Sequence, residues 1–273
     1  MPSRQPDARD VAPTVQRLRM HYAKRGRLRF TSHRDFQRVF ERAVRRAEVP
    51  IAHSAGFSPH PKISYVGAAS TGAASEAEYV EIGLTRRCDP DAVRSALDEA
   101  LPTGFDVIEV VEATGGSLAD RIDASRWQVK LLGVDPRAAA QAVAAFLQAE
   151  SIPVERVLKD GRRVLDARAA VVRLAVDSTP AEPIGLRTGV VEPGEPDGCA
   201  ILDMVVRHLT PAVRPDDVLT GLRQVSESIH LAPPLSPLVT RLAQGRLDES
   251  GRLADPLAPD RDAAAGSPHE PTV

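Results

Sequence analysis

The sequence has few of the residues that build metal centres, disulfides and membrane spans. Its 273 residues include two cysteines, Cys88 and Cys199, and no CxxC motif, which excludes a zinc ribbon and a cysteine-ligated iron–sulfur cluster built from this chain alone. We expect two reduced thiols rather than a disulfide. No apolar run approaches the ~20 residues of a membrane-spanning helix, and no secretion signal is apparent at the N-terminus. We therefore expect a cytoplasmic protein without a membrane partner.

Aromatic residues and cofactor motifs are also scarce. Aromatics make up 4% of the chain, so the core must consist mainly of Ala, Val, Leu and Ile. The sequence contains no Walker loop, no GxGxxG and no convincing Ser/His/Asp spacing. His33, His53 and His60 match no standard metal-ligand spacing, so we predict neither a metal nor a cofactor.

The most informative feature is a concentration of basic residues in a protein with a formal net charge of −2. Residues 17–62 contain twelve Lys or Arg and only three acids, at Asp35, Glu41 and Glu48. Concentrated positive charge causes self-repulsion, and its commonest reason is a polyanionic partner such as nucleic acid. The sequence therefore directs the search for function to this segment.

The order of predicted elements indicates an α+β fold of two tandem ferredoxin-like modules with antiparallel sheets. The first module spans residues 14–114 and the second residues 115–230. Residues 1–13 are expected to be disordered, and residues 231–273 to form a mostly disordered acidic tail with a short helical pattern at 238–247. Predicted strands cover residues 15–22, 62–66, 79–84, 105–111, 127–132, 154–159, 164–166, 170–176 and 199–206. Predicted helices cover residues 32–47, 89–101, 136–150 and 215–223.

The helix expected over residues 32–47 carries two stripes. Ser32 is a suitable N-cap, with Asp35 three residues later. The apolar stripe consists of Phe36, Val39, Phe40, Ala43, Val44 and Ala47. The basic stripe consists of Arg34, Arg38, Arg42, Arg45 and Arg46. We predict that the basic stripe contacts nucleic acid; the alternative is a solvated face partly paired with acids from elsewhere in the chain.

A loop rich in proline follows this helix and offers further candidate contacts. Its side chains could stack a base or hold a phosphate. The candidates are His53, Phe57, Ser58, His60 and Lys62. The alternative is a rigid turn in which Phe57 is buried.

Two other functions remain open. An RNA-acting enzyme without a metal could use His33, Asp35 and His60 as catalytic groups. A protein-interaction module could instead place the basic face on an acidic partner, or on the acidic tail of the same chain.

Three runs of sequence resemble one bacterial family. They are RLRFTSHRD at residues 27–35, ERAVRRA at residues 41–47 and SAGFSPHPKIS at residues 54–64. They are similar to the DUF2344 family, whose members are described as radical-SAM-associated and occur fused to a radical SAM protein or alone. Arg34 departs from the apolar residue usual after the Ser-His pair. The resemblance implies an accessory protein that acts with a separate radical SAM protein, and the basic segment suggests tRNA or rRNA as the shared substrate.

Overall fold

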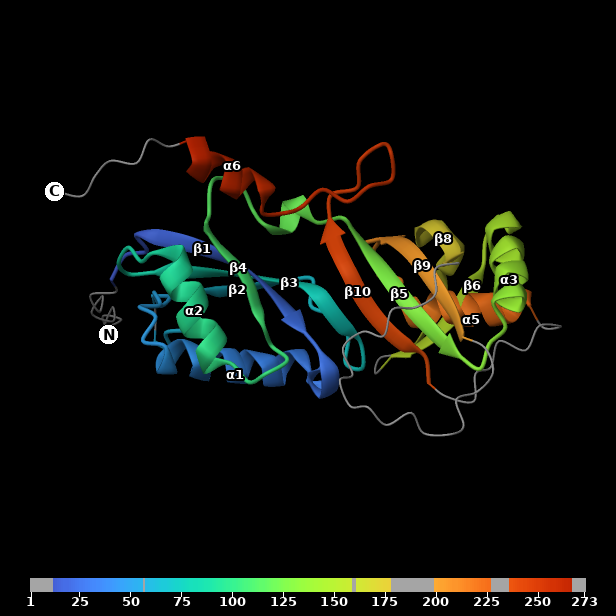
Figure 1. Cartoon of the computed structure of the whole chain (residues 1–273), viewed down its shortest axis with the longest axis horizontal. Coiled ribbons are helices and arrows are strands. Elements are labelled where there is room, and N and C mark those ends of the chain that lie inside the picture. Colours follow the sequence, from blue (N-terminus) through green and yellow to red (C-terminus); the bar gives the residue numbers. More distant parts are fainter. Residues whose placement is uncertain (1–11, 56, 159–160, 178–198, 227–235, 267–273) are drawn as a thin grey trace, which may run out of the picture. The chain divides into compact units, whose positions relative to one another are not determined.

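The computed structural model describes residues 12–55, 57–158, 161–177, 199–226 and 236–266 (Figure 1). The chain divides into two compact units. The first contains the residues up to Ile122 together with those from Asp255 onward, and the second contains Asp123–Ala254. The expected disorder of residues 1–13 falls almost wholly outside the described residues.

The first unit is a four-stranded antiparallel sheet with helices. Its strands are β1 (Gln16–Lys24), β2 (Ile63–Val66), β3 (Ala74–Leu84) and β4 (Val107–Glu112). Its helices are η1 (Gly26–Phe30), α1 (His33–Arg46), α2 (Pro90–Ala100), η2 (Ala119–Arg121) and α6 (Ala258–Gly266). The strand order is β4-β1-β3-β2, with all three pairings antiparallel.

The two principal helices of this unit begin where the sequence predicts. The Ser32 hydroxyl accepts a hydrogen bond from the Asp35 backbone N–H and caps α1. Asp89 caps α2 in the same way, and Pro90 occupies its first turn, where a missing N–H costs nothing. The apolar stripe of α1 buries Phe36, Phe40 and other members against the sheet.

The two faces of this sheet are covered differently. Leu18, Met20 and Ile82 point toward α1 and α2, which supply the other half of the main core. Residues that alternate with these, such as Arg19 and Glu81, lie on the opposite face because successive strand side chains point to opposite sides. On that second face, Tyr79 belongs to a smaller core with Leu257, which directly precedes α6.

The second unit has the same connectivity with an added hairpin. Its strands are β5 (Ala124–Leu132), β6 (Pro153–Leu158), β7 (Gly161–Asp166), β8 (Val171–Asp177), β9 (Cys199–Arg207) and β10 (Leu238–Gly245). Its helices are α3 (Pro136–Gln148), α4 (Ala167–Ala170) and α5 (Pro215–Val225). The sheet order is β10-β5-β9-β8, and β6 and β7 pair only with each other among the described strands.

The prediction of an α+β fold with antiparallel sheets is therefore confirmed. Without the β6-β7 hairpin and α4, both units run β-α-β-β-α-β, the element order of a ferredoxin-like module. Their identification as ferredoxin-like modules stays an interpretation, which this order supports.

The C-terminal segment differs from the expectation. The helix predicted at residues 238–247 is wrong, because the segment forms strand β10 and pairs antiparallel with β5. The disordered tail predicted beyond residue 230 is also wrong for residues 255–266, which include α6 and belong to the first unit. Both segments depend on contacts with residues more than 100 positions earlier, which local patterns do not reveal. The expected module boundaries at residues 114 and 230 accordingly differ from the observed division.

Candidate nucleic-acid interface

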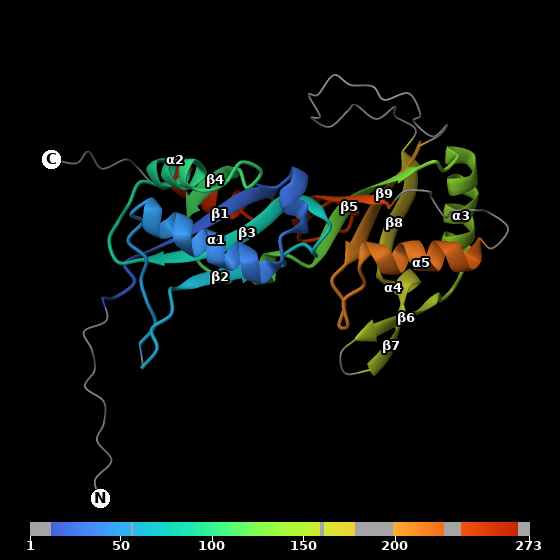
Figure 2. The same cartoon turned by 90° about the horizontal axis from the view of Figure 1, so that it is seen from below.

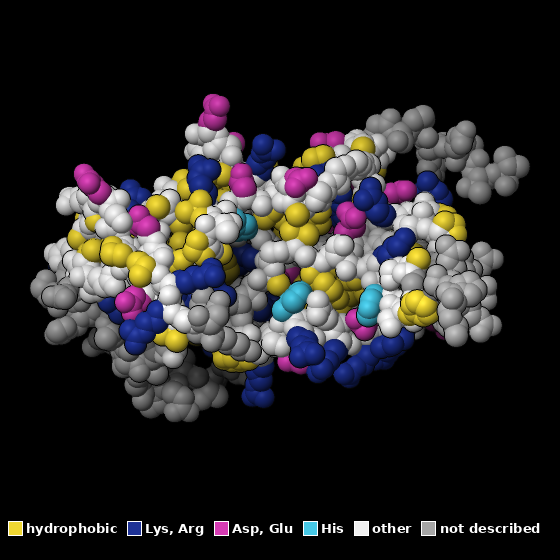
Figure 3. Space-filling model, turned by 180° about the vertical axis from the view of Figure 1, so that it is seen from behind, with side chains coloured by type: hydrophobic (Ala, Val, Ile, Leu, Met, Phe, Trp, Pro, Cys, Tyr) yellow, Lys and Arg dark blue, Asp and Glu magenta, His cyan; other side chains and the backbone are white. Residues whose placement is uncertain are grey.

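The solvent face of α1 carries five exposed arginines, Arg34, Arg38, Arg42, Arg45 and Arg46. Arg38 lies 3.7 Å from the carboxylate of Asp35, and both side chains are 60% exposed. Among the described residues, the other four arginines have no ion pair and no side-chain hydrogen bond. Figure 3 shows Lys and Arg side chains gathered in a row along this edge of the first unit, at the lower right. We call these five residues the arginine row.

Other basic residues of the same segment are used within the fold. The Arg19 side chain is fully buried and lies 2.8 Å from Glu81 and 2.9 Å from Asp260. Buried Lys24 donates to the carbonyls of Ala69 and Ser70, and Arg25 pairs with Glu76 and Asp106. These acids all lie outside residues 17–62, so the local excess of charge in the sequence overstates the cationic surface. Four members of the arginine row, together with Arg27 and Arg29, have no acidic partner among the described residues.

The loop after α1 is closed at its base and open at its tip. His53 and Pro61 form an isolated β-bridge, and the Ser54 N–H donates to the His60 carbonyl at 2.8 Å. The His60 N–H in turn donates to the Ser54 hydroxyl at 3.0 Å. Phe57 is 81% exposed, so the alternative of a turn with a buried Phe57 is wrong. The loop projects away from α1 near the C-terminal end of that helix (Figure 2). His53, Ser58 and His60 are also exposed.

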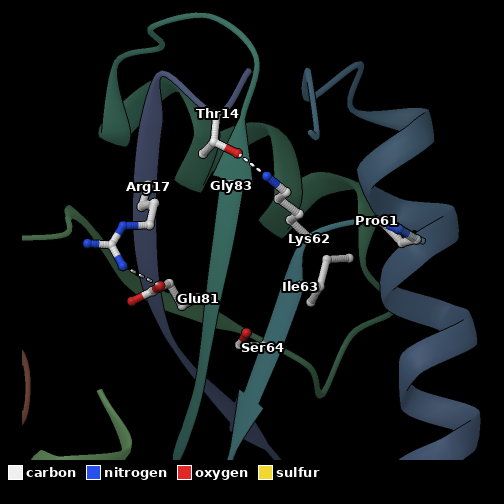
Figure 4. A pocket seen from close by; sticks show the side chains of 8 residues that line it. All are labelled: Thr14, Arg17, Pro61, Lys62, Ile63, Ser64, Glu81 and Gly83. Atoms are coloured by element: carbon white, nitrogen blue, oxygen red, sulfur yellow. Dashed lines mark hydrogen bonds and ion pairs between the residues drawn. The ribbon is translucent and has the colours of Figure 1, made fainter. Parts of the chain in front are cut away.

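Lys62 lies apart from the arginine row. Its ammonium donates to the Thr14 hydroxyl at 2.8 Å and lines a shallow depression of about 350 Å³ (Figure 4). Arg17, Ser64 and Glu81 line the same depression, on the sheet face opposite to α1 and α2. A Cβ on Gly83 would come within 3.1 Å of Thr14 and 3.3 Å of Lys62, so a glycine there lets the two side chains approach. The structure thus places the Lys62 ammonium away from the arginine row, although its backbone adjoins the His53–Pro61 bridge.

The three candidate catalytic residues are not assembled into one site. His33 Nε2 lies 3.1 Å from the Gln37 amide nitrogen, and its ring packs edge-on to Tyr65. The Asp35 carboxylate accepts a hydrogen bond from the Ser32 hydroxyl at 2.7 Å. His60 belongs to the loop beyond the far end of α1, a helix of 14 residues, or about 21 Å. His33 and Asp35 therefore make contacts within the first turns of α1, and His60 lies elsewhere.

One buried polar atom near His33 has no partner. The Tyr65 hydroxyl is buried and makes no hydrogen bond among the described residues. Burial, followed by the nearby charge of Glu41, raises the pKa of Tyr65 above its ordinary value. The hydroxyl is therefore neutral at physiological pH, and the Tyr65 ring packs edge-on against Phe36 and Phe40.

Further candidate residues just before α1 were not predicted from the sequence. Phe30 is 59% exposed, and the Arg29 guanidinium carbon lies 4.7 Å from the centre of its ring. Arg27 in the same short helix is also exposed. The sequence did contain one signal for this site: Phe30 lies between basic residues in a chain with few aromatics.

The described residues hold neither a metal-ligand cluster nor a membrane-crossing helix. No group of three or more His, Cys, Asp or Glu side chains in the described ranges is arranged to hold a metal ion. Across the same part of the chain, no helix has the length and apolar character needed to cross a membrane.

Comparisons with known proteins identify a family. No curated protein matches the chain. A crystal structure of an unknown protein from Galdieria sulphuraria is similar, with 16% sequence identity and a TM-score of 0.22, covering 83% of this chain and 98% of that one. A family model described as "Uncharacterized protein conserved in bacteria (DUF2344)" matches residues 17–215. This match covers most of the sequence and agrees with the resemblance of the motifs at residues 27–64. The chain therefore belongs to the DUF2344 family.

Proposed function

We propose that this protein binds RNA through the arginine row and the loop that follows α1. The observation that carries the proposal is the row itself, in which four of five exposed arginines have no acidic partner among the described residues. Like charges at i,i+4 destabilise a helix by a few tenths of a kcal/mol per pair. A phosphate backbone would turn this repulsion into attraction and would pair with guanidinium groups bidentately.

The resemblance to radical-SAM-associated proteins extends the proposal to a partner. We propose that the RNA is a tRNA or rRNA shared with a separate radical SAM protein, for which this chain is an accessory subunit. The chain itself has only Cys88 and Cys199, which is too few for the three-cysteine cluster of such an enzyme.

The structure offers less support for the two alternatives. An acid–base enzyme would need His33 and His60 near one reacting group, and α1 lies between them. Docking of the chain's own acidic tail has fewer carboxylates available than the sequence suggests, because Asp260 is fully buried and Asp255 pairs with Arg261, while Asp262 stays exposed. An external acidic protein remains the rival that the experiment must exclude.

The test is RNA binding at several salt concentrations with two matched charge-reversal variants. R38E/R42E/R45E reverses the centre of the arginine row. R137E/R207E/R223E makes the same change at three exposed arginines of the second unit and serves as the control. We expect the first variant to lose RNA binding and the second to retain it, with both keeping the circular dichroism of the parent.

Salt dependence gives a second, quantitative readout. If the five arginines neutralise about five phosphates of a single strand, log K should fall against log salt with a slope of about −3.5. R38E/R42E/R45E should flatten that slope, because three of the five contacts are lost. Unchanged affinity and slope in this folded variant would refute the proposal.

A further inference from the structure

The ten aromatic side chains of this protein are distributed unevenly. Seven are at most 8% exposed, and Tyr65 is half-buried. The remaining two are Phe30, at 59% exposed, and Phe57, at 81%. Leaving a phenylalanine in water forgoes the favourable burial of a large apolar side chain. The chain therefore exposes two of its few aromatic rings, and both lie next to α1.

Their positions bracket the arginine row. Phe30 ends η1, three residues before the His33 that begins α1, and Phe57 lies in the loop after the last turn of the same helix. The helix between them is about 21 Å long. At the ~3.4 Å spacing of stacked nucleotides in one strand, this length corresponds to about six nucleotides.

Cationic side chains accompany Phe30 in space and precede Phe57 in the chain. The Arg29 guanidinium lies 4.7 Å from the Phe30 ring centre, and Arg27 is two residues earlier. Phe57 comes eleven residues after Arg46, in the loop whose base is closed by the His53–Pro61 bridge. Aromatic faces set in a positively charged track are the combination with which proteins bind single strands, because bases stack on the rings while cations hold the phosphates.

We propose that the RNA bound by this protein is single-stranded, and that Phe30 and Phe57 stack its bases at the two ends of the arginine row. This inference rests on the proposed RNA binding. It also separates the RNA classes: a duplex hides its base faces and is recognised by shape, phosphates and 2′-hydroxyls, which gives exposed rings nothing to stack on.

A tryptophan placed in the loop reports stacking directly. In F57W, binding of a mixed-sequence single-stranded 12-mer should quench the new indole emission, whereas the matching duplex should leave it unchanged. The native Trp127 is 8% exposed and gives a constant background. I108W is the matched control, because Ile108 is 43% exposed on β4 of the same unit and lies outside the arginine row.

Affinity measurements with F30A/F57A complete the test. Each lost ring should weaken single-strand binding by roughly 5- to 150-fold, with duplex binding unchanged within about twofold. Because both side chains are exposed, the melting temperature should stay at the parent value.

The outcomes distinguish this inference from the proposal beneath it. In one outcome, R38E/R42E/R45E abolishes binding, but the affinity change in F30A/F57A and the emission change in F57W are the same for single strands and duplexes. RNA binding then stands, and the stacking inference is overturned. If the parent protein binds neither RNA form, both fall. Unchanged RNA affinity of F30A/F57A with loss of a bound protein partner would assign the rings to a protein interface and overturn the inference.

Discussion

The carboxylate of Asp260 should hold the C-terminal helix α6 in the first unit. It accepts hydrogen bonds from Arg19 Nη1 at 2.9 Å and 3.0 Å, and from Arg121 Nη1 at 2.7 Å. The backbone N–H and the hydroxyl of Thr114 each donate to it at 2.8 Å. The side chains of Asp260 and Arg19 are both 0% exposed. Asp260→Ala would therefore leave Arg19 buried with Glu81 as its remaining acidic partner.

The magnitude follows from the cost of breaking a buried ion pair. Removing one member of such a pair costs about 3–5 kcal/mol, because the remaining charge stays desolvated. For a unit of this size, each kcal/mol lowers the melting temperature by about 3 °C. D260A should therefore lower the melting temperature of the first unit by roughly 10–15 °C.

Differential scanning calorimetry of the full chain measures this effect. D260N should also destabilise, because its amide group presents N–H donors to two guanidinium groups. D262A is the control, since Asp262 is an exposed acid on the same helix. If D260A melts within about 2 °C of the parent while D262A does the same, the buried pair contributes little and the reasoning is refuted.

Two further predictions concern acid stability and close packing. Burial alone would raise the pKa of Asp260, but hydrogen bonds from Thr114, Arg121 and Arg19 outweigh it and hold that pKa below the ordinary 3.8. As the pH falls, the Asp260 carboxylate is protonated more readily in the unfolded chain than in the folded protein. The unfolding free energy measured by urea titration should therefore fall as the pH drops below about 4. In D260A, which lacks this carboxylate, the fall should be less steep. In the second unit, a Cβ on Gly245 would lie 1.9 Å from the Ala254 carbonyl oxygen. G245A should destabilise that unit by about 1–3 kcal/mol in the same urea assay, and an unchanged midpoint would contradict the packing.

The sequence predicted correctly those elements that are stabilised by contacts between residues close together in the chain. The N-cap Ser32, its Asp35 partner and the two stripes of α1 follow from spacing within one helix, and the structure has them as predicted. The segment at residues 238–245 has no such local determinant. Its apolar residues fit a helical spacing, and it becomes a strand because β5 offers a partner along its whole length.

The burial of Arg19 had no local signal either. Its acidic partners, Glu81 and Asp260, lie 62 and 241 residues away. An arginine in a basic segment is indistinguishable by sequence from the exposed arginines of α1. Long-range pairing of this kind is visible only once the sheet and α6 are in place.

This division between paired and unpaired arginines decides how the function can be tested. Reversing Arg19 or Arg25 would break ion pairs inside the first unit, so a loss of RNA binding in such variants would report damage to the fold. Reversing Arg42 or Arg45 removes no ion pair that the described residues make. Loss of binding there, with an unchanged melting temperature, would have no structural explanation other than lost contact with the anion. The arginine row is therefore the part of the basic segment in which charge reversal separates function from stability.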